Sequence, residues 1–250
     1  FDHGATRGNG ETGEDISENL KTIGTVPMRL RDEEREMPEF LAVRGEVLMS
    51  REGFQKMNRE KVERGEDPFA NPRNAAAGTM RQLDSGKVAD RPLQVFYYDI
   101  LKIEGENPES HSGILKALRD WGFLVNEHVS EADGMDDILD YRESMMDRRD
   151  QLDFEIDGVV IKLDDLDLRE EIGVRERSPR YAMAWKFPPK KEVTALREIV
   201  VSVGRTGILT PVALLDRVEV GGVTVSRASL HNASEVEKKD VRPGDRVRVV

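Results

Sequence analysis

The sequence of 250 residues contains no cysteine, and none of its apolar runs approaches the roughly 20 residues that a membrane-spanning helix needs. The absence of cysteine excludes disulfide bonds and thiolate-bound zinc from these residues. Residues 1–20 are polar and acidic, unlike a secretory signal peptide. The four histidines have no spacing typical of metal ligands, so we expect no metal site. Together these absences predict a soluble, cytoplasmic protein.

Basic residues are outnumbered by acidic ones in most of the chain, whose formal net charge is -11. This balance argues against a uniformly basic nucleic-acid-binding protein. From Lys186 to Val250, however, 12 Lys and Arg face 8 Asp and Glu, a balance of +4, whereas the remainder has 26 against 41, a balance of -15. Length and charge asymmetry predict a boundary just after Lys186, between a large acidic piece and a smaller basic one that is suited to face a polyanion. Because Pro188 and Pro189 close the strand that contains Lys186, the two domains are predicted over residues 1–189 and 190–250.

Two lysines end apolar strands. Residues 157–162, Asp-Gly-Val-Val-Ile-Lys, predict a turn followed by a strand with apolar residues on both faces, as in a strand covered from both sides. Residues 180–187 predict a second strand, in which Lys186 lies above small alanines. Each lysine either extends along apolar surface to solvent or directs its charge at an anion such as a phosphate. The repeated pattern favours the anion. Asp157 can serve the same cleft as Lys162 only from the turn before the strand.

Two further predicted strands contain polar or aromatic side chains that can be interpreted in two ways. In the strand predicted over residues 41–49, Arg44 and Glu46 share one face, which is either a salt-bridged surface or the wall of a cleft. In the strand predicted over residues 93–100, Tyr97 and Tyr98 point to opposite faces, so at most one ring can stack on a base and both can instead be core residues.

A helix is predicted to begin at Pro72, with Asn71 as its N-cap and an Ala-Ala-Ala-Gly patch that permits close approach. Its Arg73 and Arg81 either reach one anion or are both solvated. Apolar spacing predicts further helices over residues 14–23, 51–65, 113–121 and 136–148. After Pro189, short strands separated by turn residues predict an all-β module, a small barrel.

Seven motifs resemble those of the bacterial NAD-dependent DNA ligases, in the same order and over essentially the whole chain. They are Arg44-Gly45-Glu46-Val47, Asn71 to Gly78, Arg81-Gln82-Leu83-Asp84, Asp157 to Lys162, Lys186-Phe187-Pro188, Gly204-Arg205-Thr206-Gly207 and Leu230-His231-Asn232-Ala233. The resemblance implies an α+β fold: an ATP-grasp-like nucleotidyltransferase adenylation domain, mainly antiparallel sheets with helices, followed by part of an OB-fold β-barrel.

The resemblance also implies roles for individual residues. Glu46 would hold the ribose of the nucleotide, Tyr98 would stack on adenine, and Lys162 and Lys186 would contact the phosphates. The residues around AMP and the nicked DNA would be Arg73, Arg81, Arg149 and Asp157, with Arg205 facing the duplex. Fixed cations suit this chemistry because nucleotidyl transfer develops negative charge on phosphate oxygens.

The implied reaction uses NAD and Mg²⁺ (or Mn²⁺), and its partner is nicked double-stranded DNA. A lysine takes AMP from NAD, AMP passes to the 5′-phosphate, and the 3′-hydroxyl then seals the nick with release of AMP, as DNA replication and repair require. The resemblance implies a monomer, and zinc only in a C-terminal region beyond these residues.

The sequence departs from this family in one respect: the family's nucleophile lies in Lys-x-Asp-Gly, which does not occur here. Because the chain starts at Phe1 and ends within a strand-like alternation, we expect a fragment whose nucleophile precedes Phe1 and which alone forms no enzyme-AMP. The alternatives are an ATP-dependent ligase or capping-type nucleotidyltransferase, against which the Asn71 to Gly78 block argues, and a non-catalytic nucleotide- or DNA-binding remnant.

Overall fold

A computed structural model describes all residues except 11, 176–177, 190, 204–206, 221–222 and 250. The chain forms two compact units, Phe1–Phe187 and Pro188–Val250, which are described separately below. Among the described residues, no helix combines the length and the apolar character needed to cross a bilayer.

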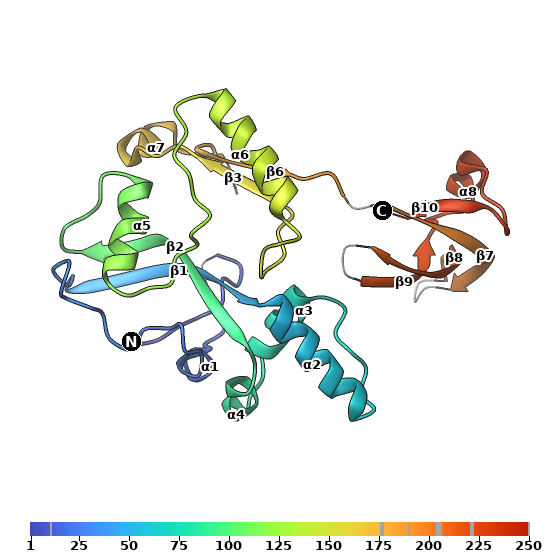
Figure 1. Ribbon diagram of the computed structural model, residues 1–250, viewed down its shortest axis with the longest axis horizontal. Helices are drawn as coiled ribbons and strands as arrows, with labels where there is room; N and C mark the ends of the chain where they lie inside the picture. Colours follow the sequence, from blue (N-terminus) through green and yellow to red (C-terminus); the bar gives the residue numbers. More distant parts are fainter. Residues whose placement is uncertain (11, 176–177, 190, 204–206, 221–222, 250) are drawn as a thin grey trace. The chain divides into compact units, whose positions relative to one another are not determined.

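The first unit is built around a long antiparallel pair, β1 (Phe40–Met49) and β2 (Leu93–Glu104), drawn in blue and green in Figure 1. Both strands were predicted, and β2 continues past the predicted end at residue 100. Their register shifts twice. One shift lies where Arg44 pairs with Asp99 and Gly45 pairs with Tyr97, which leaves Tyr98 as an extra residue, a β-bulge.

Most helices of this unit begin where short polar side chains cap them, whereas those that begin at Ser17 and Met135 have no side-chain cap. Ser50, Asn71 and Ser110 each accept a hydrogen bond from a backbone N–H of the first turn, and the predicted Asn71 cap is thereby confirmed. The helices are α1 (Ser17–Lys21), α2 (Arg51–Glu63), α3 (Pro72–Met80), α4 (Ser85–Ala89), α5 (His111–Asp120), α6 (Met135–Arg148) and α7 (Leu166–Ile172). The first is shorter than the helix predicted over residues 14–23, and the core of the unit lies between β2, α3 and α5.

A second, shorter ribbon pairs β3 (Gly158–Lys162) with β6 (Ala182–Lys186), in antiparallel register. A separate apolar cluster that includes Val159, Phe187 and Met145 of α6 lies on one side of it. The prediction that β3 is covered on both faces was wrong, because Val160 is 61% exposed. An apolar run does not distinguish a strand covered on both sides from one covered on one side. A two-residue pair, β4 (Val174–Arg175) and β5 (Ser178–Pro179), lies between the two strands in the chain.

The second unit is a four-stranded antiparallel sheet in the order β10-β7-β8-β9. Its elements are β7 (Glu192–Val203), β8 (Leu209–Val220), β9 (Val223–Ser229), α8 (Ala233–Lys239) and β10 (Arg246–Val249), coloured orange to red in Figure 1. A small core contains Leu196, Ala213, Leu215 and Leu230. The predicted all-β module is confirmed, with one helix added. In the part of the chain that the structure describes, the sheet is open rather than a closed barrel.

Candidate functional site

The outer face of β1 and β2 carries charged side chains near the bulge. Arg44 and Glu46 are exposed, as strand alternation predicted. Without the bulge at Tyr98, alternation would place Asp99 on the buried face of Tyr97. Because Asp99 instead pairs with Arg44, it shares the polar face of β1. The bulge therefore adds a carboxylate to this face that the sequence pattern did not reveal.

The two adjacent tyrosines of β2 have different environments. Tyr97 is 7% exposed, packs edge-on against Phe123 at 4.7 Å between ring centroids, and has a pKa raised to about 12 by burial. Tyr98 is half-buried, and the Lys162 ammonium lies 5.1 Å from its ring centroid, within cation–π range. Burial also raises the pKa of Tyr98. Of the two rings, Tyr98 is the one that lies beside a predicted site residue.

Lys162 ends β3 and is half-buried. Its Nζ lies 3.0 Å from Nε2 of His111, at the start of α5. Burial lowers the pKa of Lys162; the positive charges of Arg169 and Arg44 act in the same direction, and the carboxylate of Asp99 opposes them. A desolvated ammonium of this kind interacts strongly with an incoming anion, because little water competes for it.

Lys186 ends β6 and is paired with a carboxylate. Its Nζ lies 3.0 Å from Oδ2 of Asp157, and the two side chains are 73% and 75% exposed. Asp157 lies in a bend before β3, where its backbone carbonyl accepts a hydrogen bond from Phe187. The position of Asp157 outside the regular strand is the one that the Asp-Gly pair predicted.

The register places both lysines on one face of the β3–β6 ribbon, at opposite ends. Lys162 is opposite Ala182 and Lys186 is opposite Gly158, so about 13 Å of strand separates them. Gly158 permits this pairing: a Cβ there would lie 2.5 Å from the carbonyl oxygen of Trp185 and 2.6 Å from Cα of Lys186. Between the two lysines, this face of the ribbon is formed by Val160 and by the small residues Gly158, Ala182 and Ala184.

The predicted arginines are dispersed. Arg73 lies 4.0 Å from Glu46 and Arg81 lies 3.6 Å from Glu14, so these two exposed side chains have different carboxylate partners. Arg149 is half-buried, and its backbone carbonyl accepts a hydrogen bond from Arg51. The predicted Arg205 lies outside the described residues.

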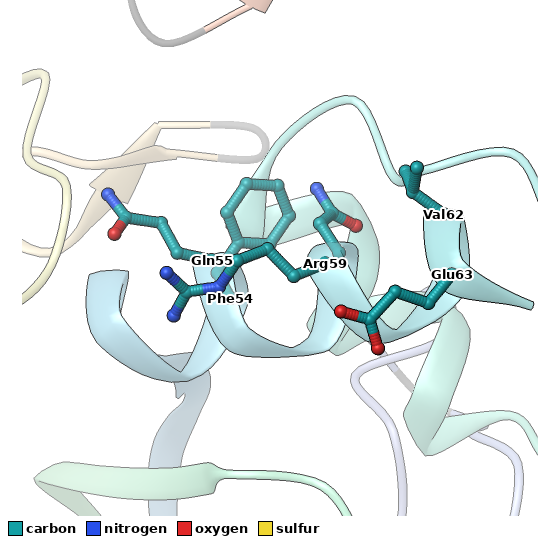
Figure 2. Close-up of a pocket in the computed structure, with 6 residues that line it drawn as sticks. Phe54, Gln55, Arg59, Val62 and Glu63 are labelled. Carbon is teal, nitrogen blue, oxygen red and sulfur yellow. The ribbon is translucent and has the colours of Figure 1, made fainter.

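Two of the hollows among the described residues of the first unit bear on the predicted site. A polar one of about 650 Å³, called the loop hollow below, lies beside the N-terminal loop that contains Gly8 and Gly13. Its lining residues are Thr6, Arg7, Gly8, Thr12, Gly13, Glu14 and Arg81. The other, of about 560 Å³, lies along α2, and Figure 2 shows its lining side chains extending from that one helix. The α2 hollow contains none of the predicted site residues, whereas the loop hollow contains Arg81.

Sequence reasoning missed three residues that contact or face Lys162: His111, Asp99 and Arg169. His111 was considered only as a metal ligand, and the described residues contain no group of three or more side chains that could bind a metal ion. No local pattern marks His111, because its contact joins residues 51 positions apart. A search for buried histidines near strand-end lysines requires the fold.

Comparisons with known proteins place the chain in a family. The model of the NAD-dependent DNA ligase adenylation domain matches residues 1–190, and that of the NAD-dependent DNA ligase OB-fold domain matches residues 193–250. The chain is similar to proteins named DNA ligase from Haloarcula marismortui (55% identity over 249 residues), Salinibacter ruber (52% over 247) and Haloferax volcanii (54% over 249). These alignments cover 100%, 98% and 100% of this chain but only 36%, 36% and 35% of the relatives. Matches to both domain models, in this order, show that the chain belongs to the NAD-dependent DNA ligase family.

Proposed function

We propose that the protein containing this chain seals nicks in duplex DNA with NAD as the source of AMP. The observation that carries the proposal is the group formed by Tyr98, Lys162 and Asp99 in a chain that belongs to this ligase family. An aromatic ring beside a desolvated cation suits a nucleotide, whose base stacks and whose phosphates are anionic. The chain spans about a third of the relatives' length, so other parts of the reaction would lie in other segments.

In this proposal, Tyr98 stacks on adenine and Glu46 accepts a hydrogen bond from the ribose. Lys162 provides the buried cation next to the base and the first phosphate. Lys186 is paired with Asp157. A phosphate oxygen of the nucleotide would compete with this carboxylate for the ammonium. Charge developing on the phosphate oxygens during transfer is stabilised by these lysines, which are point charges on flexible stems.

The remaining predicted residues would contact AMP and DNA, with Arg149 among those that bind the cofactor. Arg73, Arg81 and Arg149 would lie around AMP and the 5′-phosphate, and Arg205 would face the duplex. Arg73 and Arg81 are exposed and held only by single carboxylates at 3.6–4.0 Å, so exchange for a phosphate costs little. We further propose a domain boundary at residues 189 and 190, a monomer, and an OB-type barrel that other segments complete, with salt-sensitive DNA affinity.

A divalent cation, Mg²⁺ or Mn²⁺, would accompany the phosphates. The described residues provide no cluster of three or more possible ligands, so they form no dedicated metal cage. Mg²⁺ commonly keeps several waters and binds through substrate phosphates and one or two carboxylates. The roles proposed for Lys162 and Lys186 do not depend on the ion.

The test uses the full-length protein and a singly nicked duplex, with NAD or ATP as the nucleotide. We expect sealing with NAD and none with ATP. The 250-residue chain, which has no Lys-x-Asp-Gly motif, should form no covalent adenylate with labelled NAD. Sealing with ATP alone would indicate the ATP-dependent class, and nucleotide or DNA binding without sealing would indicate a non-catalytic protein. Either result contradicts the proposal.

A further inference from the structure

His111 is held rigidly by the segment that follows Lys162. Its backbone N–H donates to the carbonyl of Asp164 at 2.8 Å. The next residue, Ser112, donates its backbone N–H and its hydroxyl to the two carboxylate oxygens of Asp164, at 2.7 and 2.9 Å. Ser110 and Asp165 form an isolated antiparallel bridge. The start of α5 is thus fixed to the loop that leaves β3, and this fixes the imidazole beside Lys162.

The imidazole lies between two cations. Nε2 is 3.0 Å from Nζ of Lys162, and Nδ1 is 3.4 Å from Nη1 of Arg169. A neutral imidazole has one acceptor nitrogen, so only one cation can donate to it. The shorter contact assigns the acceptor to Lys162. The proton is then on Nδ1 and faces the Arg169 guanidinium, which accounts for the longer distance.

Arg169, which lies beside Nδ1 of His111, is itself held in place by other residues. It is 7% exposed, its Nε donates to the carbonyl of Leu163, and its guanidinium lies 4.8 Å from the ring centroid of Tyr181. Its Nη2 is buried without a hydrogen-bond partner in the structure. A buried donor without a partner lowers the stability of the folded protein. The contacts of Arg169 with Leu163 and Tyr181 therefore have to hold its side chain in place.

His111 is neutral at physiological pH. It is 9% exposed, and its pKa is lowered to about 4, mainly by burial and further by the charges of Lys162 and Arg169, with Asp164 opposing. Neutrality has a consequence for Lys162. A carboxylate would cancel the charge of the ammonium, whereas an imidazole accepts its hydrogen bond and leaves the full positive charge for an anion.

We propose that His111 is a positioning residue that holds the Lys162 ammonium through Nε2 and keeps it directed at the nucleotide phosphate. This inference rests on the proposed function for the identity of the anion, but not for the contact itself. His111 does not touch the nucleotide. It acts by fixing where the charge of Lys162 lies, and the bonds that join Asp164 to the backbone of His111 and to Ser112 fix His111.

The first experiment measures single-turnover adenylation of the full-length protein by labelled NAD. His111→Leu, which removes the acceptor, should lower the maximal rate about tenfold. His111→Gln, which retains an acceptor oxygen, should stay within about threefold of wild type. In a Lys162→Met background, His111→Leu should cause little further loss, because residues that act through one another are not additive. The matched control is His128→Leu, a half-buried histidine outside the site, which should behave as wild type.

The pH dependence of the adenylation rate shows whether His111 acts through its hydrogen bond to Lys162 or only through its packing in the fold. The hydrogen bond to His111 favours the ammonium, so its loss should lower the pKa of Lys162 and move the alkaline limb of the profile to lower pH. The other charged groups facing Lys162 are Asp99, Arg44 and Arg169, and they are the same in all variants. His111→Gln should keep the wild-type limb. Lys162→Arg identifies the limb, because arginine does not deprotonate in this range.

A second experiment tests the contact without any activity. In the 250-residue chain, ¹⁵N NMR of the imidazole should show a neutral Nδ1–H form down to about pH 5. An ordinary titration of His111 would overturn the inference, as would wild-type rate and alkaline limb in a folded His111→Leu protein. If the His111→Leu protein does not fold, the adenylation rate of His111→Gln and the NMR titration of the wild type still test the inference. Absence of adenylation in the wild type, with the NMR result as expected, would instead refute the proposed function alone.

Discussion

Lys162 and Lys186 occupy the same face of one ribbon, yet their surroundings are opposite. Lys162 is half-buried and bonded to a neutral imidazole, while Lys186 is 73% exposed and paired with the Asp157 carboxylate. A half-buried cation with a neutral partner is a preformed charge that water screens less than it screens an exposed one. An exposed ion pair contributes little and exchanges partners readily. We infer that Lys162 is a fixed part of the site and Lys186 an adjustable one.

The largest expected effect comes from removing the fixed cation. Lys162→Met in the full-length protein should lower the adenylation rate about 10²- to 10³-fold, as loss of a preorganised charge does. The factor should be nearly the same at about 0.05 and 0.5 M salt, because a buried charge is little screened. For Lys186→Met the factor should shrink as salt rises. Lys116→Met, an exposed lysine on α5, is the control and should have no effect. If the loss in rate depended equally on salt for Lys162→Met and Lys186→Met, the proposed difference between a fixed and an adjustable lysine would be wrong.

Gly158→Ala should disrupt the ribbon that carries both lysines. The added Cβ would lie 2.5 Å from the carbonyl oxygen of Trp185, which is backbone and cannot rotate away. We expect the free energy of unfolding to fall by about 1–3 kcal/mol, measured by urea denaturation. Gly78→Ala is the matched control: it lies in α3, where nothing beyond the chain neighbours and the helix's own backbone lies within 4 Å of the added Cβ, and it should be neutral or stabilising. Similar values for the two variants would contradict this account.

Acid should destabilise the Lys162 side of the ribbon through His111. The folded-state pKa of about 4 lies below the ordinary value of 6.5, so the unfolded chain binds the proton first as pH falls. The contribution is complete above pH 6.5 and is lost between pH 6.5 and 4, by about 3 kcal/mol at most. The free energy of unfolding of the wild type should therefore fall more steeply over this range than that of His111→Gln. Parallel curves would show that His111 is not buried in the neutral form.

The smallest effect is expected at the exposed pair. Asp157→Asn should change the free energy of unfolding by less than about 1 kcal/mol at 0.1 M salt and by almost nothing at about 1 M, because both partners face water. Asp164→Asn, which weakens the two hydrogen bonds from Ser112, should cost more, about 1–2 kcal/mol. A reversed order would mean that the Lys186 pair, not the Lys162 network, is the rigid one.

Several elements followed from local sequence. The helix at Pro72 begins where Asn71 can cap it, and β3 begins at Gly158 with Asp157 in the bend before it, the position predicted for Asp157. These signals act between residues a few positions apart, so they do not depend on the rest of the fold. Alternation also gave the polar face of β1, with Arg44 and Glu46 exposed.

Other features depend on what lies opposite a residue in space. Alternation along β2 could not reveal the bulge at Tyr98, because a bulge is defined by the register with β1. The exposure of Val160 likewise depends on which elements cover β3, not on its own side chain.

By itself, the sequence determined the strands that end in Lys162 and Lys186 and, through seven motifs, the ligase family. Only the tertiary structure decided how each lysine is held. The Lys162 contact needs His111, which is 51 residues away and is placed by the bonds between Asp164 and the start of α5. Local periodicity describes one element at a time, whereas the charge state and direction of a buried lysine are set by neighbours from several elements.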